Sequence, residues 1–368
     1  MQIDFHHGVT YVVARYAGFS HGEANTIAYS AQYVDDATNA GLVKFDKNII
    51  YRRLSSAHGM IDHRNLKEIN NHLVWMPFHF LPGNGGLPAG ENPKGSFIEK
   101  IVCKPNSPVA QDMVEACIND QCKPYALHRL GITAHVYVDT WAHQQFAGIV
   151  HAVNGVDNLV GPAPDETVPW WSQKWWTLKF WTRTWNAFVA LFQSAIPPIG
   201  HGQALTNPDL PFAQWSYTNG LGKKIERDNL TDFTEAADEL CKVFKNYRNG
   251  KHDPSSTGLA PGQKRLLHDM FDTIRSTDAE ERHREWLDAI KGDAFGFGAQ
   301  KVEFVPKGHG SWKHAALGTT AAFDLGTEEH PYNESFLTSD WKMFHDAAKE
   351  HRLTVIDDIL PKYGICAG

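Results

Sequence analysis

A row of histidine and aspartate side chains between residues 126 and 143 constrains this chain more than any other feature. Read as a helix, the segment places four such side chains at steps of four or seven residues: His128, His135, Asp139 and His143. Because an α-helix turns once per ~3.6 residues, these steps return to nearly the same face. An apolar stripe runs beside the row, formed by Leu127, Gly131, Ala134, Val138 and Ala142. Neutral imidazole and carboxylate are standard zinc ligands, so the row predicts a metal site; the alternative is a set of unrelated core histidines.

The spacing of this row also sets the smallest number of metal ions. His135 and His143 are separated by about 12 Å along the axis, because each helical residue rises ~1.5 Å. A single zinc ion with bonds of roughly 2 Å cannot bind both histidines. Two ions could, with Asp139 between them. The pattern therefore predicts a cluster of at least two ions, completed by ligands from other segments.

The N-terminal part of the chain offers further candidate ligands. Residues 5–18 are predicted to be helical, and Ser20-x-x-Glu23 then has the form of a capping box that begins a second helix. Asp35 falls on the apolar face of this second helix, and Asp36 lies about 100° away. A buried carboxylate needs a partner, which could be a metal ion or an arginine. His6 and His7 precede these residues.

Later segments contribute two more histidines. His79 stands between two phenylalanines in a segment, residues 40–107, that is predicted to be rich in loops. His201 is flanked by Gly200 and Gly202, which allow a close approach of the backbone. His201 and Asp209 are both candidate ligands, and His201 is the stronger of the two.

Composition excludes several classes of protein. With 368 residues, 42% apolar and 21% charged, the chain can bury a large core. A net charge of −7 argues against a general nucleic-acid-binding surface. The five cysteines form no CxxC pair, and a disulfide framework is not expected. The N-terminus has no visible cleavable secretory signal, which predicts a cytoplasmic protein or one exported by a signal-independent route.

The segment 168–194 combines six tryptophans with lysine and arginine. It contains no uncharged apolar run of ~18 residues, so it is not a transmembrane helix. Tryptophan with basic residues is typical of a helix that lies at a membrane surface, and a long core helix is the alternative. Residues 108–119, 123–151 and 231–248 are predicted to be helices, and most of the remaining chain also has helical periodicity. The expected fold is therefore mainly α, a single large helical domain with a loop-rich segment and the metal cluster between helices.

The sequence lacks the motifs of several enzyme classes: G-x-S-x-G, a Walker loop, a dinucleotide-binding G-x-G-x-x-G and HExxH. Histidine and aspartate brought together from helices and loops suit hydrolysis, in which clustered divalent ions activate water and neutralise charge on a phosphoryl group. The ordered ligand pattern resembles that of the zinc-dependent phospholipase C and S1/P1 nuclease group. It is more closely similar to a bacterial family of zinc metallophospholipases C. Four blocks carry this resemblance, Asp4–Tyr11, Gln32–Ala37, His135–His143 and Gly200–Ala204.

The resemblance implies two or three zinc ions and a phospholipid substrate bound from the bilayer surface, without nucleic acid as a partner. The implied metal ligands are His6 or His7, Asp35 or Asp36, His79, His135, Asp139, His143 and His201. Asp35 or Asp36 would also assist as a base. The distant group holds one ion through an N-terminal tryptophan, whereas this sequence begins Met-Gln-Ile-Asp, so Asp4 is the candidate substitute.

The expected organisation is a metal-binding catalytic core at 1–220, including the Trp-rich segment 168–194, with a helical C-terminal extension at 221–368. Oligomeric state and head-group preference are left open. Two alternative functions remain. One is an S1/P1-like nuclease or HD-type phosphohydrolase, in which tryptophans would stack on bases. The other is a non-catalytic membrane-interacting protein with a structural metal.

Overall fold

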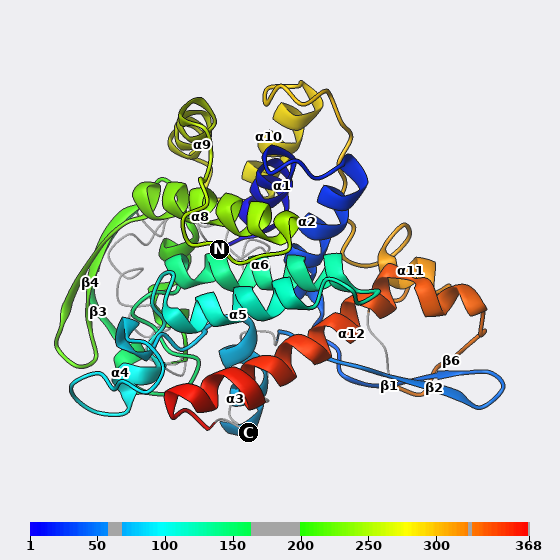
Figure 1. The fold of residues 1–368 in the computed structure, drawn as a ribbon, viewed down its shortest axis with the longest axis horizontal. Coiled ribbons are helices and arrows are strands. Elements are labelled where there is room, and N and C mark those ends of the chain that lie inside the picture. The colour runs from blue at the N-terminus through cyan, green and yellow to red at the C-terminus, as the bar shows by residue number, and fades with distance from the viewer. Residues whose placement is uncertain (58–67, 163–198, 323–325, 367–368) are drawn as a thin grey trace, which may run out of the picture.

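The computed structural model describes residues 1–57, 68–162, 199–322 and 326–366, and it confirms a mainly α fold (Figure 1). The Trp-rich segment 168–194, His58 and His63 lie outside the described residues. The chain begins with a π-helical turn, η1 (Asp4–Val9). The helices are α1 (Thr10–Tyr16), α2 (His21–Asp36), α3 (Glu68–Phe78), α4 (Ile98–Ile101), α5 (Pro108–Asn119), α6 (Ala126–Ala142), α8 (Asn229–Asn249), α9 (Pro261–Thr273), α10 (Ala279–Lys291), α11 (Trp312–Leu317) and α12 (Asp340–Leu353).

Two small three-stranded sheets flank the helices. The first has the order β2-β1-β6 and the second β3-β4-β5. Their strands are β1 (Gly41–Phe45), β2 (Ile49–Arg53), β3 (Val156–Val160), β4 (Gln214–Asn219), β5 (Lys224–Asp228) and β6 (Glu329–His330). The β1–β2 hairpin extends away from the helices at one end of the molecule, and β3 and β4 lie at the opposite end (Figure 1). Neither sheet contributes a ligand to the site described below.

Helix α6 occupies the centre of the fold. It packs against α2, α5, α8 and α12, and every residue from His128 to Ala142 is buried (Figure 1). The helix was expected to run over residues 123–151 but ends at Ala142, with His143 as its C-cap. The chain reverses soon afterwards at Gln145, whose φ is +72°. His143 therefore lies at the end of the helix instead of inside it.

Local side-chain caps begin α2 and α10, and the one at α2 was predicted. Ser20 and Glu23 form the expected capping box at the start of α2. Asp278 caps α10 by accepting hydrogen bonds from the backbone of Glu280 and Glu281. The main hydrophobic cluster joins residues before and after position 220, as in the contacts of Phe5 with Phe233 and Phe271. Among the described residues, no helix combines the length and apolarity needed to cross a membrane.

Helices α2 and α6 approach each other closely at Gly131, and this approach gives a first prediction. A Cβ at Gly131 would lie 2.3 Å from the Ile27 carbonyl oxygen and 2.5 Å from Ser30 Cβ. We expect Gly131→Ala to lower the free energy of unfolding by about 1–3 kcal/mol, because α2 must move away from α6. Urea denaturation measures the change. Gly22→Ala is the matched control, since Gly22 lies in α2 with open space around its Cα; a neutral Gly131→Ala would contradict the prediction.

Buried neutral histidines in α12 predict sensitivity to acid. His345 is 2% exposed, and burial together with the positive charges of Lys349 and Arg53 lowers its pKa to about 3. The unfolded chain takes up this proton below pH 6.5 whereas the folded chain does not. The stability contributed by neutral His345 is thus complete above pH 6.5 and falls by about 1.4 kcal/mol per pH unit as the pH drops towards 3.

The test of this prediction is the variant His345→Asn, followed by urea unfolding at pH 7 and pH 5. Asparagine can still accept the hydrogen bond that His345 Nδ1 accepts from the Leu54 backbone N–H. We expect the variant to lose less stability between the two pH values than the parent protein. Equal losses in the two proteins would show that His345 does not titrate on unfolding.

Candidate metal centre

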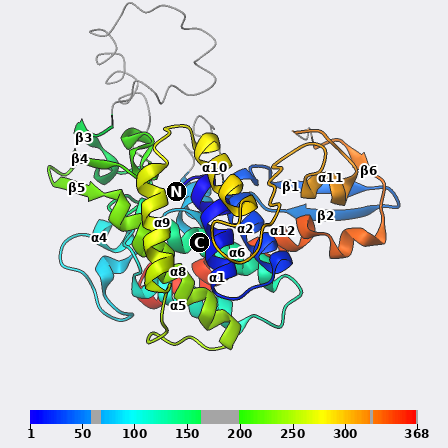
Figure 2. The same ribbon diagram turned by 90° about the horizontal axis from the view of Figure 1, so that it is seen from above.

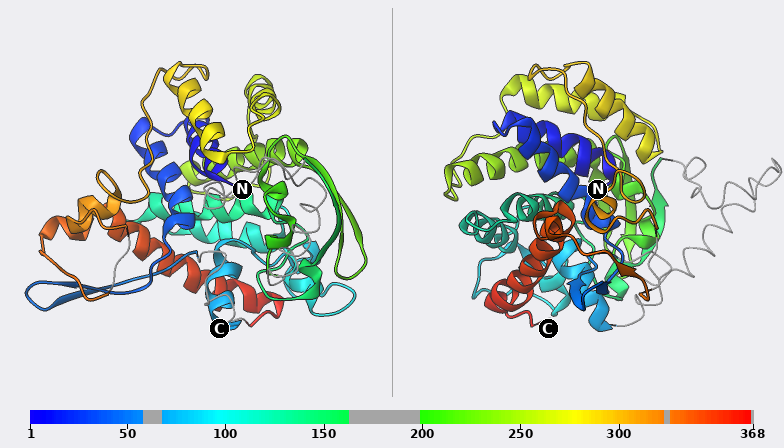
Figure 3. Two further views of the ribbon diagram at one scale, coloured as in Figure 1. Left: turned by 180° about the vertical axis from the view of Figure 1, so that it is seen from behind. Right: turned by 90° about the vertical axis from the view of Figure 1, so that its right-hand side faces the viewer.

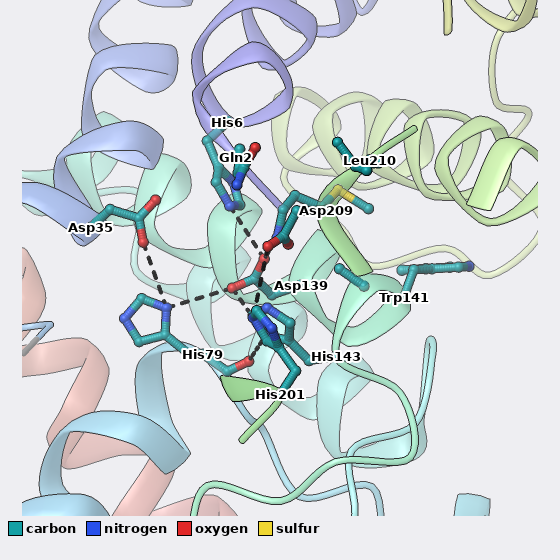
Figure 4. Close-up of polar contacts among 12 residues, drawn as sticks. Gln2, His6, Asp35, His79, Asp139, Trp141, His143, His201, Asp209 and Leu210 are labelled. Carbon is teal, nitrogen blue, oxygen red and sulfur yellow. Dashed lines mark hydrogen bonds and ion pairs between the residues drawn. The ribbon is translucent and has the colours of Figure 1, made fainter. Parts of the chain in front are cut away.

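Eight histidine and aspartate side chains from distant parts of the chain converge beside α6. All of them except His135 are labelled in Figure 4. They form three groups, each with ligand atoms within 4.8 Å of one another: His6, Asp35 and His135; His79, His135 and Asp139; and His143, His201 and Asp209. His6 comes from η1, Asp35 from the last turn of α2, and His79 from the residue after α3. His201 precedes the short turn η7 (Gly202–Ala204), and Asp209 ends η8 (Asn207–Asp209).

Asp139 lies at the centre of this constellation. Its Oδ1 is 3.2 Å from His6 Nε2, and its Oδ2 is 3.2 Å from His135 Nε2. Oδ2 also lies 3.6 Å from His79 Nδ1 and 3.5 Å from His143 Nδ1. The carboxylate therefore faces all three groups, as the helical spacing predicted for a ligand between two ions.

Backbone carbonyls orient four of the imidazoles. His135 Nδ1 lies 2.8 Å from the Ala31 carbonyl oxygen, and His79 Nε2 lies 2.9 Å from the Ser56 oxygen. His143 Nδ1 contacts the His79 oxygen at 2.7 Å, and His201 Nδ1 contacts the Leu205 oxygen at 3.2 Å. A carbonyl oxygen only accepts, so each of these nitrogens is the N–H of its ring. Such contacts fix the tautomer of metal-binding histidines.

This tautomer assignment leaves lone pairs facing one another. His135 Nε2 and His79 Nδ1 are 3.3 Å apart, and in the neutral rings neither carries a proton. Asp35 Oδ1 lies 3.8 Å from each of the two nitrogens. Nitrogen lone pairs and carboxylate oxygens repel at such distances in a buried site unless a metal ion or a proton lies among them.

The electrostatics keep Asp139, His6 and His143 in the forms that can bind metal. Burial alone would favour a neutral Asp139, but the neighbouring His143 and the amino group of Met1 hold its pKa well below the usual value. Burial lowers the pKa of His6 to about 4 and that of His143 well below its ordinary value, so both are neutral at pH 7. Burial also opposes protonation of His135, but Asp139 and Asp35 raise its pKa.

The amino nitrogen of Met1 also lies in the site. It is 2.6 Å from Asp139 Oδ1 and 3.2 Å from Asp209 Oδ1. Burial would lower the pKa of this amine, but the two carboxylates raise it to about 11. Asp4, the candidate substitute for an N-terminal ligand, instead forms a buried ion pair with Arg282. The Met1 nitrogen was not among the predicted ligands, because no local sequence pattern indicates that a main-chain amine is buried.

Glycine allows the close approach that was expected near His201. Gly200 has φ +52°, and a Cβ there would lie 2.2 Å from the ring of Phe80. The ring of His201 consequently stacks on that of His143, with centroids 4.7 Å apart. Asp209 Oδ2 lies 3.8 Å from His201 Nε2, so this weaker candidate lies beside the stronger one.

Besides Asp4, three candidates lie outside the ligand groups. His7 points away and its Nδ1 contacts His283 Nε2 at 2.8 Å, so of the pair it is His6 that reaches the cluster. His128 is one heptad from His135, but it pairs with Asp340 at 2.9 Å, because α12 covers that end of α6. Asp36 is next to Asp35 and accepts a hydrogen bond from Gln32, and burial raises its pKa to about 6.

The cluster is exposed to solvent at two of its members. The side chains of Asp35 and His201 are 35% and 21% exposed, whereas those of His6, His135 and Asp139 are at most 1% exposed. A small molecule from solvent can therefore reach the cluster beside Asp35 and His201, while the other ligands are shielded. Such an arrangement of fixed inner ligands and an accessible edge is suited to chemistry on a bound substrate.

Comparison with known proteins places the chain in a family without assigning a function to it. The chain belongs to DUF6765, a family of unknown function whose model matches residues 1–359. No curated protein and no solved structure matches the chain. The family match includes every residue of the constellation in Figure 4.

Proposed function

We propose that this protein is a metal-dependent phosphodiester hydrolase that binds two or three zinc ions, and that it acts as a phospholipase C on glycerophospholipids. The observation that carries the metal is that His79 Nδ1 and His135 Nε2, the ring nitrogens that backbone carbonyls do not engage, face each other at 3.3 Å beside Asp139. A divalent cation would bind between them by accepting their lone pairs. Two histidines and a carboxylate are also a common zinc ligand set.

Buried atoms without partners fit the same proposal. Among the described residues, both ring nitrogens of His6 and Oδ2 of Asp139 are buried without a hydrogen bond of good geometry. Such atoms are costly because they have lost water and gained nothing in return. His6, Asp139 and their neighbours would hold ions at the three ligand groups.

In the proposed reaction, the zinc ions and the residues around them have different roles. Clustered zinc ions would supply water activation and neutralise charge on the phosphoryl group. Asp35 and His201 would leave the accessible edge of the cluster open to the phosphodiester. Asp36, held by Gln32 at the same end of α2, would accept a proton from the attacking water. The lipid substrate is supported by the resemblance to zinc metallophospholipases C and by the composition of residues 168–194.

The experiment measures zinc content and hydrolysis together. Protein dialysed against chelator is reloaded with zinc, its ions per chain are counted, and it is incubated with phosphatidylcholine vesicles. We expect two or three ions per chain and release of diacylglycerol and phosphocholine only from the reloaded protein. His135→Ala should lose both properties. His128→Ala is the matched control on the same helix, because His128 pairs with Asp340 outside the cluster.

Three other results of this experiment would each contradict a defined part of the proposal. Cleavage of single-stranded DNA without release of diacylglycerol would replace the phospholipid by a nucleic acid. Full zinc occupancy with no hydrolysis of either substrate would indicate that the metal has only a structural role. Absence of bound zinc from the parent protein would reject the proposal entirely.

A further inference from the structure

The first nine residues lie between the metal centre and helix α10, which comes some 270 residues later in the chain. The two segments pack directly against each other, and α10 lies beside the start of the chain in the views of Figures 2 and 3. His6 and His7 are adjacent in sequence but face opposite ways. His6 contacts Asp139 in the cluster, and His7 contacts His283 of α10.

Arg282 of α10 makes the strongest contact with this segment. Its side chain is fully buried, and Nε donates to Asp4 Oδ2 at 2.6 Å. A second guanidinium nitrogen donates to Gln2 Oε1 at 2.7 Å, and a third to the Ser276 carbonyl oxygen at 2.9 Å. The planar guanidinium therefore fixes residues on both sides of Ile3 at once, in a single geometry.

Two further contacts hold the next turn. His283 Nε2 lies 2.8 Å from His7 Nδ1. A Cβ on Gly8 would lie 2.9 Å from Trp286 Cβ, so the backbone of η1 rests directly on α10. The residues that hold η1 from this side are all in α10: Arg282, His283 and Trp286.

The chemistry of the contact between Arg282 and Asp4 indicates its role. A buried ion pair adds little net stability, because the desolvation of both charges offsets their attraction, but it does select one geometry. The turn that it holds is π-helical, a conformation that is rare and that often occurs at functional sites. In this turn His6 points into the cluster while Asp4 and His7 point towards α10.

We propose that Arg282 and His283 are positioning residues of the metal centre, which hold η1 so that His6 can bind its ion. The inference rests on the proposed metal-dependent function, and it adds that α10 determines how tightly the ion at His6 is bound. Neither side chain is among the ligand groups. They act through Asp4, Gln2 and His7, as partners of ligand-bearing segments do in other metal sites.

The experiment compares Arg282→Met with Arg284→Met, in the full-length protein. Arg284 is its matched control on the same helix, since its side chain is 68% exposed and forms a surface salt bridge with Glu281 at 3.7 Å. Zinc is titrated into chelator-treated protein, and the ions per chain and the affinity of each are measured. We expect Arg282→Met to bind one ion 10- to 100-fold more weakly and Arg284→Met to match the parent protein. Arg282→Lys should bind this ion with intermediate affinity. Lysine can pair with Asp4 but lacks the second guanidinium nitrogen that donates to Gln2.

A second variant keeps the inference testable if Arg282→Met does not fold, because that variant leaves Asp4 buried without a partner. Asp4→Leu with Arg282→Met removes both charges, a replacement that proteins often tolerate. We expect the double variant to fold and still to bind one ion weakly. A folded double variant that binds every ion as tightly as the parent protein would overturn the inference. A parent protein that binds no zinc would instead reject the proposed function, so the two failures are distinguishable.

Discussion

Replacement of Asp139 by asparagine is expected to lower zinc-dependent hydrolysis by at least about 10³-fold, equivalent to about 4 kcal/mol of transition-state stabilisation. Asparagine has nearly the shape of aspartate but no charge. Asp139 contacts His6 and His135 through different oxygens, so in the proposed cluster its charge would serve more than one ion. The same variant should bind fewer zinc ions than the parent protein. Hydrolysis of phosphatidylcholine vesicles and elemental analysis of the purified variant measure the two effects.

Asp340→Asn is the control for this substitution. Asp340 also pairs with a histidine of α6, His128, at 2.9 Å, but its side chain is 51% exposed and lies outside the ligand groups. We expect this variant to keep its full zinc content and activity. If Asp139→Asn bound as many ions as the parent protein and hydrolysed lipid at the same rate, the central role given to Asp139 would be wrong.

Removal of the metal is expected to destabilise the protein strongly. Without cations the buried site concentrates lone pairs and carboxylates, and ions that bind only the folded chain stabilise it by mass action. At free zinc of 100 times Kd, each ion adds about 2.7 kcal/mol to the free energy of unfolding. Thermal unfolding with chelator and with zinc restored should therefore give clearly different midpoints.

Variants of α6 make this second prediction specific to the site. His128→Ala should show the same zinc-dependent shift of the midpoint as the parent protein, whereas His135→Ala should show a much smaller one. An identical midpoint in chelator and in zinc would mean that the folded chain holds no ion tightly. A shift that persisted unchanged in His135→Ala would place the ions elsewhere in the molecule.

Predictions from local sequence patterns were the most successful. The capping box at Ser20 and the helices over residues 108–119 and 231–248 depend on neighbours within one or two turns, and each is present with boundaries shifted by two residues at most. The predicted helix over residues 123–151 was too long. The helix stops at Ala142 because the chain turns so that the Phe146 carbonyl accepts a hydrogen bond from the Cys103 N–H and Gly148 packs against Met76 of α3.

The metal centre shows which of its features follow from local sequence and which depend on the packing of distant segments. The sequence by itself determined that His135, Asp139 and His143 share one side of α6, because helical periodicity is a local property of the backbone. Only the tertiary structure decided that His6 and not His7 reaches them, that His128 pairs with Asp340, and that Arg282 holds the first residues in place. The physical reason is that these contacts join segments up to about 280 residues apart. Which side chains meet then depends on how whole helices pack, and no spacing along the chain records that.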